Sequence, residues 1–148
     1  MILVSSCLCG EKCKYNGGDN YSETVMAYCK DKEVVPICPE VMGGLSIPRS
    51  PAEIIGGTAK DVLEGRAKVI SKDHKDITSA FIKGAKEVLE IIKGNKVEEA
   101  ILKANSPSCG KGMIYDGSFS AKLIEGNGLT AQVLLDVGIK VRTEKDLK

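Results

Sequence analysis

The stretch EVVPICPEVMGGL, residues 33–45, carries the pattern that decides the fold. Its apolar start, residues 33–37, is typical of a short buried strand, and this run ends directly on Cys38. Pro39 and the two glycines at residues 43–44 then predict a loop after the strand. The pattern therefore predicts a strand whose carboxyl end delivers a thiol into a loop.

Two other cysteines have the same setting. Cys7 follows a β-prone run at the start of the chain, and Cys109 lies in the loop NSPSCG, residues 105–110, after another apolar run. Loops that leave the carboxyl ends of parallel strands gather at one edge of a sheet, where α/β proteins bind ligands. We therefore expect Cys7, Cys38 and Cys109 to converge.

Extended and helical patterns alternate along the rest of the chain. Because strands alternate with helices, we expect one α/β domain over residues 1–148, with a three-layer Rossmann-like arrangement in which helices flank a mainly parallel sheet. Residues 144–148 are polar and are expected to fray. The sequence predicts strands over residues 2–5, 33–37, 67–71, 99–103 and 139–141, helices over residues 21–32, 76–93 and 128–137, and a short helical turn within residues 48–57.

The composition excludes several classes of protein. Lys and Arg number 21 against 20 Asp and Glu, a formal charge of +1 that argues against a dominant polyanion-binding surface. Aromatic residues make up only 4% of the chain, so a stacking platform for single-stranded nucleic acid is not expected. The chain starts without a signal-peptide pattern and has no apolar run of about 20 residues, so we expect a cytoplasmic protein without a membrane partner.

The six cysteines need an explanation in a compartment where thiols stay reduced. Soft thiolates select zinc or iron–sulfur clusters, but structural zinc sites usually take paired cysteines, and the three loop cysteines are far apart. A cubane cluster held by three cysteines would leave one iron open, with Cys9 and Cys13 as candidate fourth ligands. Buried inert thiols and a metal-free nucleophilic cysteine are the alternatives, and the single histidine, His74, gives Cys–His hydrolase chemistry little support.

A series of short motifs is shared with a known family. They are VSSCLCG (residues 4–10), YNGG (15–18), PICPEVMGGL (36–45), PRSPAEI (48–54), DIT (76–78), SPSCG (106–110) and GNGLTA (126–131). In this order they resemble the thiouracil desulfidase (TudS-like) family along essentially the whole chain. The resemblance implies a [4Fe–4S] cluster that is bound by Cys7, Cys38 and Cys109 and has one open iron. It also implies an enzyme that removes sulfur from thiolated uracil as sulfide.

We hypothesise how this reaction is divided among the residues. The open iron would polarise the thiocarbonyl group toward attack by water. Glu40, two residues from Cys38, is the candidate general acid–base, with a role in capping or hydrogen-bonding its loop as the alternative. Ser106 and Ser108 either hydrogen-bond substrate or water or stabilise their turn. Arg49 is expected to pair with Glu53, with orientation of a pyrimidine oxygen as the alternative.

Other functions are compatible with the same cysteines. One is a non-catalytic iron–sulfur or sulfide carrier, and another is a zinc-binding interaction module built on Cys7, Cys9, Cys13 and a distant cysteine. For the enzyme, the expected partner is a small thiolated pyrimidine or nucleoside. Thiolated tRNA is the alternative, which the balanced charge and the few aromatic residues disfavour.

Overall fold

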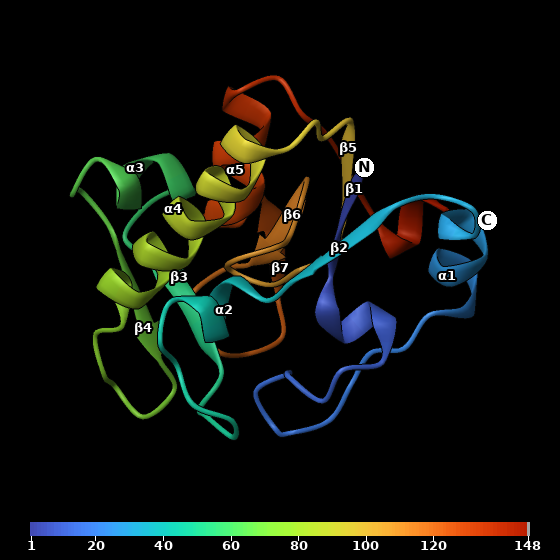
Figure 1. Ribbon diagram of the computed structural model, residues 1–148. Helices are drawn as coiled ribbons and strands as arrows, with labels where there is room; N and C mark the ends of the chain where they lie inside the picture. Colours follow the sequence, from blue (N-terminus) through green and yellow to red (C-terminus); the bar gives the residue numbers. More distant parts are fainter. Residues whose placement is uncertain (148) are drawn as a thin grey trace.

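A four-stranded parallel sheet forms the centre of the computed structural model, which describes residues 1–147 (Figure 1). Its order is β2-β1-β5-β8, and every neighbouring pair is parallel. The register aligns Ile2 with both Val34 and Glu99, so the strands start level and their carboxyl ends reach the same edge. The strands are β1 (Ile2–Ser5), β2 (Val34–Ile37), β5 (Glu99–Leu102) and β8 (Lys140–Thr143).

Helices cover both faces of this sheet. The helices α4 (Thr78–Gly94) and α5 (Leu129–Asp136) lie on one side of it, and α1 (Glu23–Cys29) lies on the other (Figure 1). Because side chains alternate along a strand, Leu3 faces the cluster around α4 and α5, whereas Val4 faces the one around α1. The expected three-layer arrangement with a mainly parallel sheet is confirmed.

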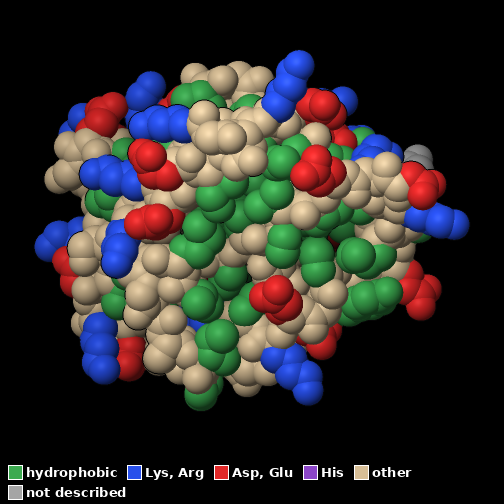
Figure 2. Space-filling view, in the orientation of Figure 1, with side chains coloured by type: hydrophobic (Ala, Val, Ile, Leu, Met, Phe, Trp, Pro, Cys, Tyr) green, Lys and Arg blue, Asp and Glu red, His purple; other side chains and the backbone are tan. Residues whose placement is uncertain are grey.

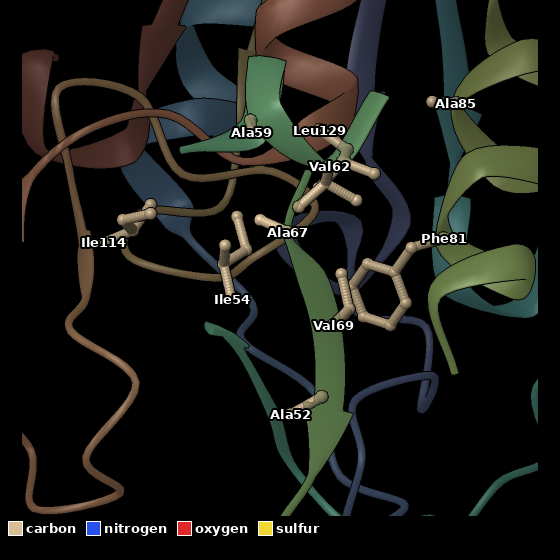
Figure 3. Close-up of a cluster of buried hydrophobic side chains, with 10 residues drawn as sticks. All are labelled: Ala52, Ile54, Ala59, Val62, Ala67, Val69, Phe81, Ala85, Ile114 and Leu129. Carbon is tan, nitrogen blue, oxygen red and sulfur yellow. The ribbon is translucent and has the colours of Figure 1, made fainter. Parts of the chain in front are cut away.

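A second hydrophobic core lies beside the sheet. There, β3 (Ala52–Ile55) and β4 (Lys68–Ser71) pair antiparallel and pack with α3 (Ala59–Leu63) against α4. Figure 3 shows the ring of Phe81 next to Val69 in this cluster. The prediction of a helical turn within residues 48–57 is wrong, because residues 52–54 are buried and form a strand that pairs with β4. The predicted strand at residues 67–71 exists, but outside the parallel sheet.

Short elements complete the chain. A 3₁₀ turn, η1 (Ser6–Cys9), follows β1, a single helical turn, α2 (Pro39–Met42), follows β2, and a hairpin of β6 (Met113–Tyr115) and β7 (Leu123–Glu125) follows β5. None of these was predicted from the sequence, since each is too short to show a period.

The end of the chain is ordered as far as the structure describes it. Residues expected to fray form a 3₁₀ turn, η2 (Glu144–Asp146), with a capping box between Thr143 and Asp146. Leu147 then packs against the cluster around α1, while Lys148 lies outside the described residues. Within residues 1–147, no helix is long and apolar enough to cross a membrane.

Candidate active site

The carboxyl ends of β1, β2 and β5 open onto a cavity of ≈ 430 Å³. Cys7 lies in the turn after β1, Cys38 stands immediately after β2 as the N-cap of α2, and Cys109 lies in the loop after β5. All three line the cavity, as the sequence predicts. Sheet topology is the cause, because the three strands are neighbours in one parallel sheet.

Close packing of two helices fixes the segment that follows Cys38. A Cβ atom on Gly84 of α4 would lie 2.0 Å from the carbonyl oxygen of Pro39, and one on Gly43 would lie 2.0 Å from that of Ala80. Side chains at either glycine would therefore push α2 off α4. This contact holds Cys38 and its neighbours at the cavity.

The loop around Cys109 is held by the start of α5. The backbone N–H of Leu129 donates to the carbonyl of Pro107 (2.8 Å), and that of Thr130 donates to the carbonyl of Ser108 (2.9 Å). These bonds satisfy N–H groups that a helix leaves free at its first turn. Within the loop, Ser106 Oγ accepts from the backbone N–H of Cys109 (2.8 Å), so Ser106 stabilises the turn as well as lining the cavity.

Glu40, the candidate acid–base, lies between a serine and an arginine. Ser108 Oγ donates to Glu40 Oε2 (2.8 Å), and Arg49 Nε donates to Glu40 Oε1 (3.2 Å). The side chain of Arg49 is only 9% exposed, and its Nη2 also donates to the carbonyl of Cys13 (2.9 Å). The expected pairing of Arg49 with Glu53 is wrong: Glu53 accepts two backbone N–H groups from a distant loop instead.

A fourth thiol, that of Cys13, lies among the cysteines of the cavity. Cys38 Sγ donates to the carbonyl of Cys13 (3.9 Å). The neighbouring S–H of Cys13 stabilises the thiolates of Cys7 and Cys38 and lowers the pKa of each to about 7 despite burial. The same two neighbours, together with burial, raise the pKa of Cys13.

The remaining cysteines differ from that group. Cys109 is buried, which raises its pKa to about 12, although Ser5 Oγ donates to its sulfur (3.4 Å) and Ser108 Oγ lies 3.7 Å from it. Cys9 does not line the cavity, and burial raises its pKa, as it does for Cys29. Of the two candidate fourth ligands, Cys13 thus lies at the cavity and Cys9 does not.

The thiols around the cavity determine which kind of metal centre it could hold. Within residues 1–147, no group of three or more His, Cys, Asp or Glu side chains is arranged to hold a single metal ion. A cubane cluster binds each cysteine through a different iron, and its ligands lie farther apart than those of a single ion. Three soft thiols around one cavity, two of them easily ionised, fit such a cluster.

Comparison with known proteins agrees with this chemistry. A family model described as 2-thiouracil desulfurase matches residues 2–146. The chain belongs to this family. It is 48% identical to the uncharacterized protein YbbK of Bacillus subtilis (strain 168), over 99% of this chain and 97% of that protein. It is also similar to the solved structure of the [4Fe-4S]-dependent thiouracil desulfidase TudS, with a TM-score of 0.84, 35% identity, and coverage of 98% of this chain and 91% of that one.

The aromatic part of the cavity wall in this desulfurase-family chain was not predicted from the sequence. Tyr15, Tyr115 and Phe119 line it, although aromatic residues are few and scattered in the sequence. Tyr115 and Phe119 belong to the hairpin that carries no strand-like alternation. No local signal could have placed these rings at the cavity.

Proposed function

We propose that the chain is an iron–sulfur-dependent desulfidase that converts a thiolated pyrimidine, of the 2-thiouracil type, to the corresponding oxo-pyrimidine and sulfide. Membership of the 2-thiouracil desulfurase family supports the desulfidase chemistry. The observation that carries the rest is the hydrogen bond of 2.8 Å between Ser108 and Glu40 in a cavity lined by three candidate ligand thiols. An acid–base pair and a soft-metal site therefore share one cavity.

Cys7, Cys38 and Cys109 would hold the cluster. When bound, it would supply a soft Lewis acid that prefers sulfur to oxygen and polarises the C=S bond. Cys7 and Cys38 ionise near pH 7, whereas binding at Cys109 must displace a proton from a thiol of pKa about 12. Cys13, whose pKa is raised by its two neighbouring thiols, is left out of the ligand set.

Glu40 would act on water. Its carboxylate accepts a proton from the attacking water and returns one to a ring nitrogen or to the leaving sulfur, so that C=S and water give C=O and hydrogen sulfide. Arg49 orients the carboxylate of Glu40 through its hydrogen bond to Oε1. Ser108 donates to the other oxygen, Oε2, which is the oxygen that would exchange the proton. Ser106 serves by holding the backbone of Cys109.

The test is anaerobic reconstitution with iron and sulfide, followed by sulfide release from 2-thiouracil. The loaded protein should be brown, and Cys38→Ala should lose this colour. Glu40→Gln should keep the cluster but lose turnover by about 10²- to 10⁴-fold, the range for general acid–base catalysis. Glu87→Gln, an exposed carboxylate on α4, is the matched control and should be fully active.

Three outcomes would contradict parts of the proposal. Full colour in Cys38→Ala would remove that residue from the ligand set. Turnover in Glu40→Gln equal to that of the control would remove Glu40 from the mechanism, and a loaded protein that turns over no thiopyrimidine would instead favour the sulfide carrier. A parallel assay with thiolated tRNA distinguishes the free base from the nucleic acid as substrate.

A further inference from the structure

The cavity wall is unusually rich in aromatic side chains for this chain. The protein has four tyrosines, two phenylalanines and no tryptophan, and Tyr15, Tyr115 and Phe119 all line this cavity. Half of the aromatic residues therefore meet at one site, although they are distant in the sequence. On the face shown in Figure 2, acidic and basic side chains are interspersed, and no broad patch of one charge is seen there that could bind a charged ligand.

The hairpin that carries two of these rings contributes little to the hydrophobic core. Ile114 is its one buried residue within β6 and β7, while Met113, Leu123 and Ile124 are exposed. Packing alone does not account for a hairpin of this kind. Its inner side, with Tyr115 and Phe119, faces the cavity.

A buried carboxylate fixes the tip of this hairpin. Glu53 of β3 is only 8% exposed, and its Oε1 accepts from the backbone N–H groups of Gly117 (2.9 Å) and Phe119 (3.2 Å). Phe119 itself is in the left-handed region, with φ of 56°. A non-glycine residue keeps such a conformation only where its surroundings impose it. Glu53 thus fixes the backbone position of Phe119, and with it the place from which the ring extends.

We propose that Phe119 and Tyr115 form a stacking wall that recognises the planar ring of the substrate, and that Glu53 is the positioning residue that holds this wall in place. The inference rests on the proposed function, because it assigns the ring of the same pyrimidine that Glu40 would attack. Stacking on an aromatic side chain selects a flat, unsaturated ring irrespective of its exocyclic groups. The site then distinguishes planar thiopyrimidines from saturated thioamides and thioureas, which carry the same C=S bond.

The test compares 2-thiouracil with 5,6-dihydro-2-thiouracil, in which the ring is saturated and puckered but the thiocarbonyl and both N–H groups remain. In the loaded enzyme, Phe119→Leu should raise KM for 2-thiouracil by about 5- to 150-fold, the range for one stacked base, with kcat nearly unchanged. KM for the dihydro compound should not change. Phe119→Trp should keep the preference for the planar ring, and Leu123→Ala, an exposed residue of the same hairpin, is the matched control.

Glu53 is tested by a conservative pair. Glu53→Ala should reproduce the rise in KM for 2-thiouracil, whereas Glu53→Gln, which keeps the Oε1 acceptor, should restore most of the affinity. If the role of Glu53 were purely structural, Glu53→Ala would lower the thermal unfolding temperature and would change kcat for both compounds alike. That result would overturn the positioning role.

The proposal fails separately from the proposed function. If Phe119→Leu is folded and retains the wild-type KM and the wild-type preference for the planar ring, the stacking wall is refuted while desulfidation stands. If the loaded wild-type protein releases no sulfide, calorimetric titration with uracil still tests the wall. Binding that weakens in Phe119→Leu but not in Leu123→Ala supports it, and equal or absent binding in all three proteins refutes it.

Discussion

Gly84→Ala should displace the segment that carries Cys38 and Glu40. The added methyl carbon would lie 2.0 Å from the carbonyl oxygen of Pro39, whereas ordinary van der Waals contact begins at 3.4 Å, so α2 must move by about 1.4 Å. Forcing an extra methyl group into a packed interface costs about 1–3 kcal/mol. Alanine in a helix returns about 1 kcal/mol relative to glycine, and we expect a net loss of about 0–2 kcal/mol in the free energy of unfolding.

The matched control lies on the same helix. Gly94 has nothing within 4 Å of its Cβ position, so Gly94→Ala adds the same methyl group without the contact and should be neutral or slightly stabilising. The difference between the two variants isolates the cost of overpacking, about 1–3 kcal/mol. Urea unfolding of the cluster-free protein, followed by circular dichroism, measures it.

The functional effect should exceed the effect on stability. A misplacement of about 1 Å in a catalytic group lowers rates by about 100-fold, so Gly84→Ala should release sulfide far more slowly than Gly94→Ala. Iron and acid-labile sulfide per chain should also fall, because Cys38 moves with α2. If Gly84→Ala is as stable as Gly94→Ala and loads the same iron, the contact between α2 and α4 does not position the site.

Three further predictions follow from the same geometry. Ser108→Ala should lower kcat by about 10- to 100-fold with KM unchanged, since a hydrogen bond to a charged group contributes about 1.5–3 kcal/mol; an unaltered kcat would make this serine structural. In the cluster-free protein, iodoacetamide should alkylate Cys7 and Cys38 with a midpoint near pH 7, because thiolate is the reactive form and a lowered pKa moves its appearance to lower pH. Cys109, with its pKa raised to about 12, should stay unmodified at that pH, and peptide mass mapping that finds all three equally reactive would contradict this order. Thr58→Ala removes the capping box of α3 and should cost about 1 kcal/mol in thermal or urea unfolding, whereas Thr58→Ser should restore it.

The sequence predicts the central sheet because its strands have a clear local pattern. Buried runs such as residues 2–4 and 100–102 are continuous and apolar, as is typical of parallel strands with both faces covered. The segment 48–57 contains two prolines and two glycines, which resemble a loop, and only pairing with residues 68–71 makes part of it a strand. The hairpin at residues 113–125 is mostly exposed, so no hydrophobic pattern marks it.

The site was predictable where it follows from topology. Loops after neighbouring parallel strands must meet, and this is why three isolated cysteines could be grouped from their positions alone. The partner of Arg49 was not predictable, because Glu53 is nearer to it in the sequence than Glu40 and only the fold brings Glu40 to the arginine. The position of Cys13 between two thiols depends on the path of a glycine-rich loop, which has no regular geometry.

The placement of the three cysteines after β1, β2 and β5 has a consequence for the biogenesis of the protein. The first two thiols become available together once the early strands pair, but the third arrives only after β5 has joined β1 across most of the chain. Such distant pairing is slow relative to local structure. A nascent chain therefore cannot bring Cys7, Cys38 and Cys109 together until most of it has left the ribosome, so a cluster held by these three thiols would be inserted only after most of the chain has been synthesised.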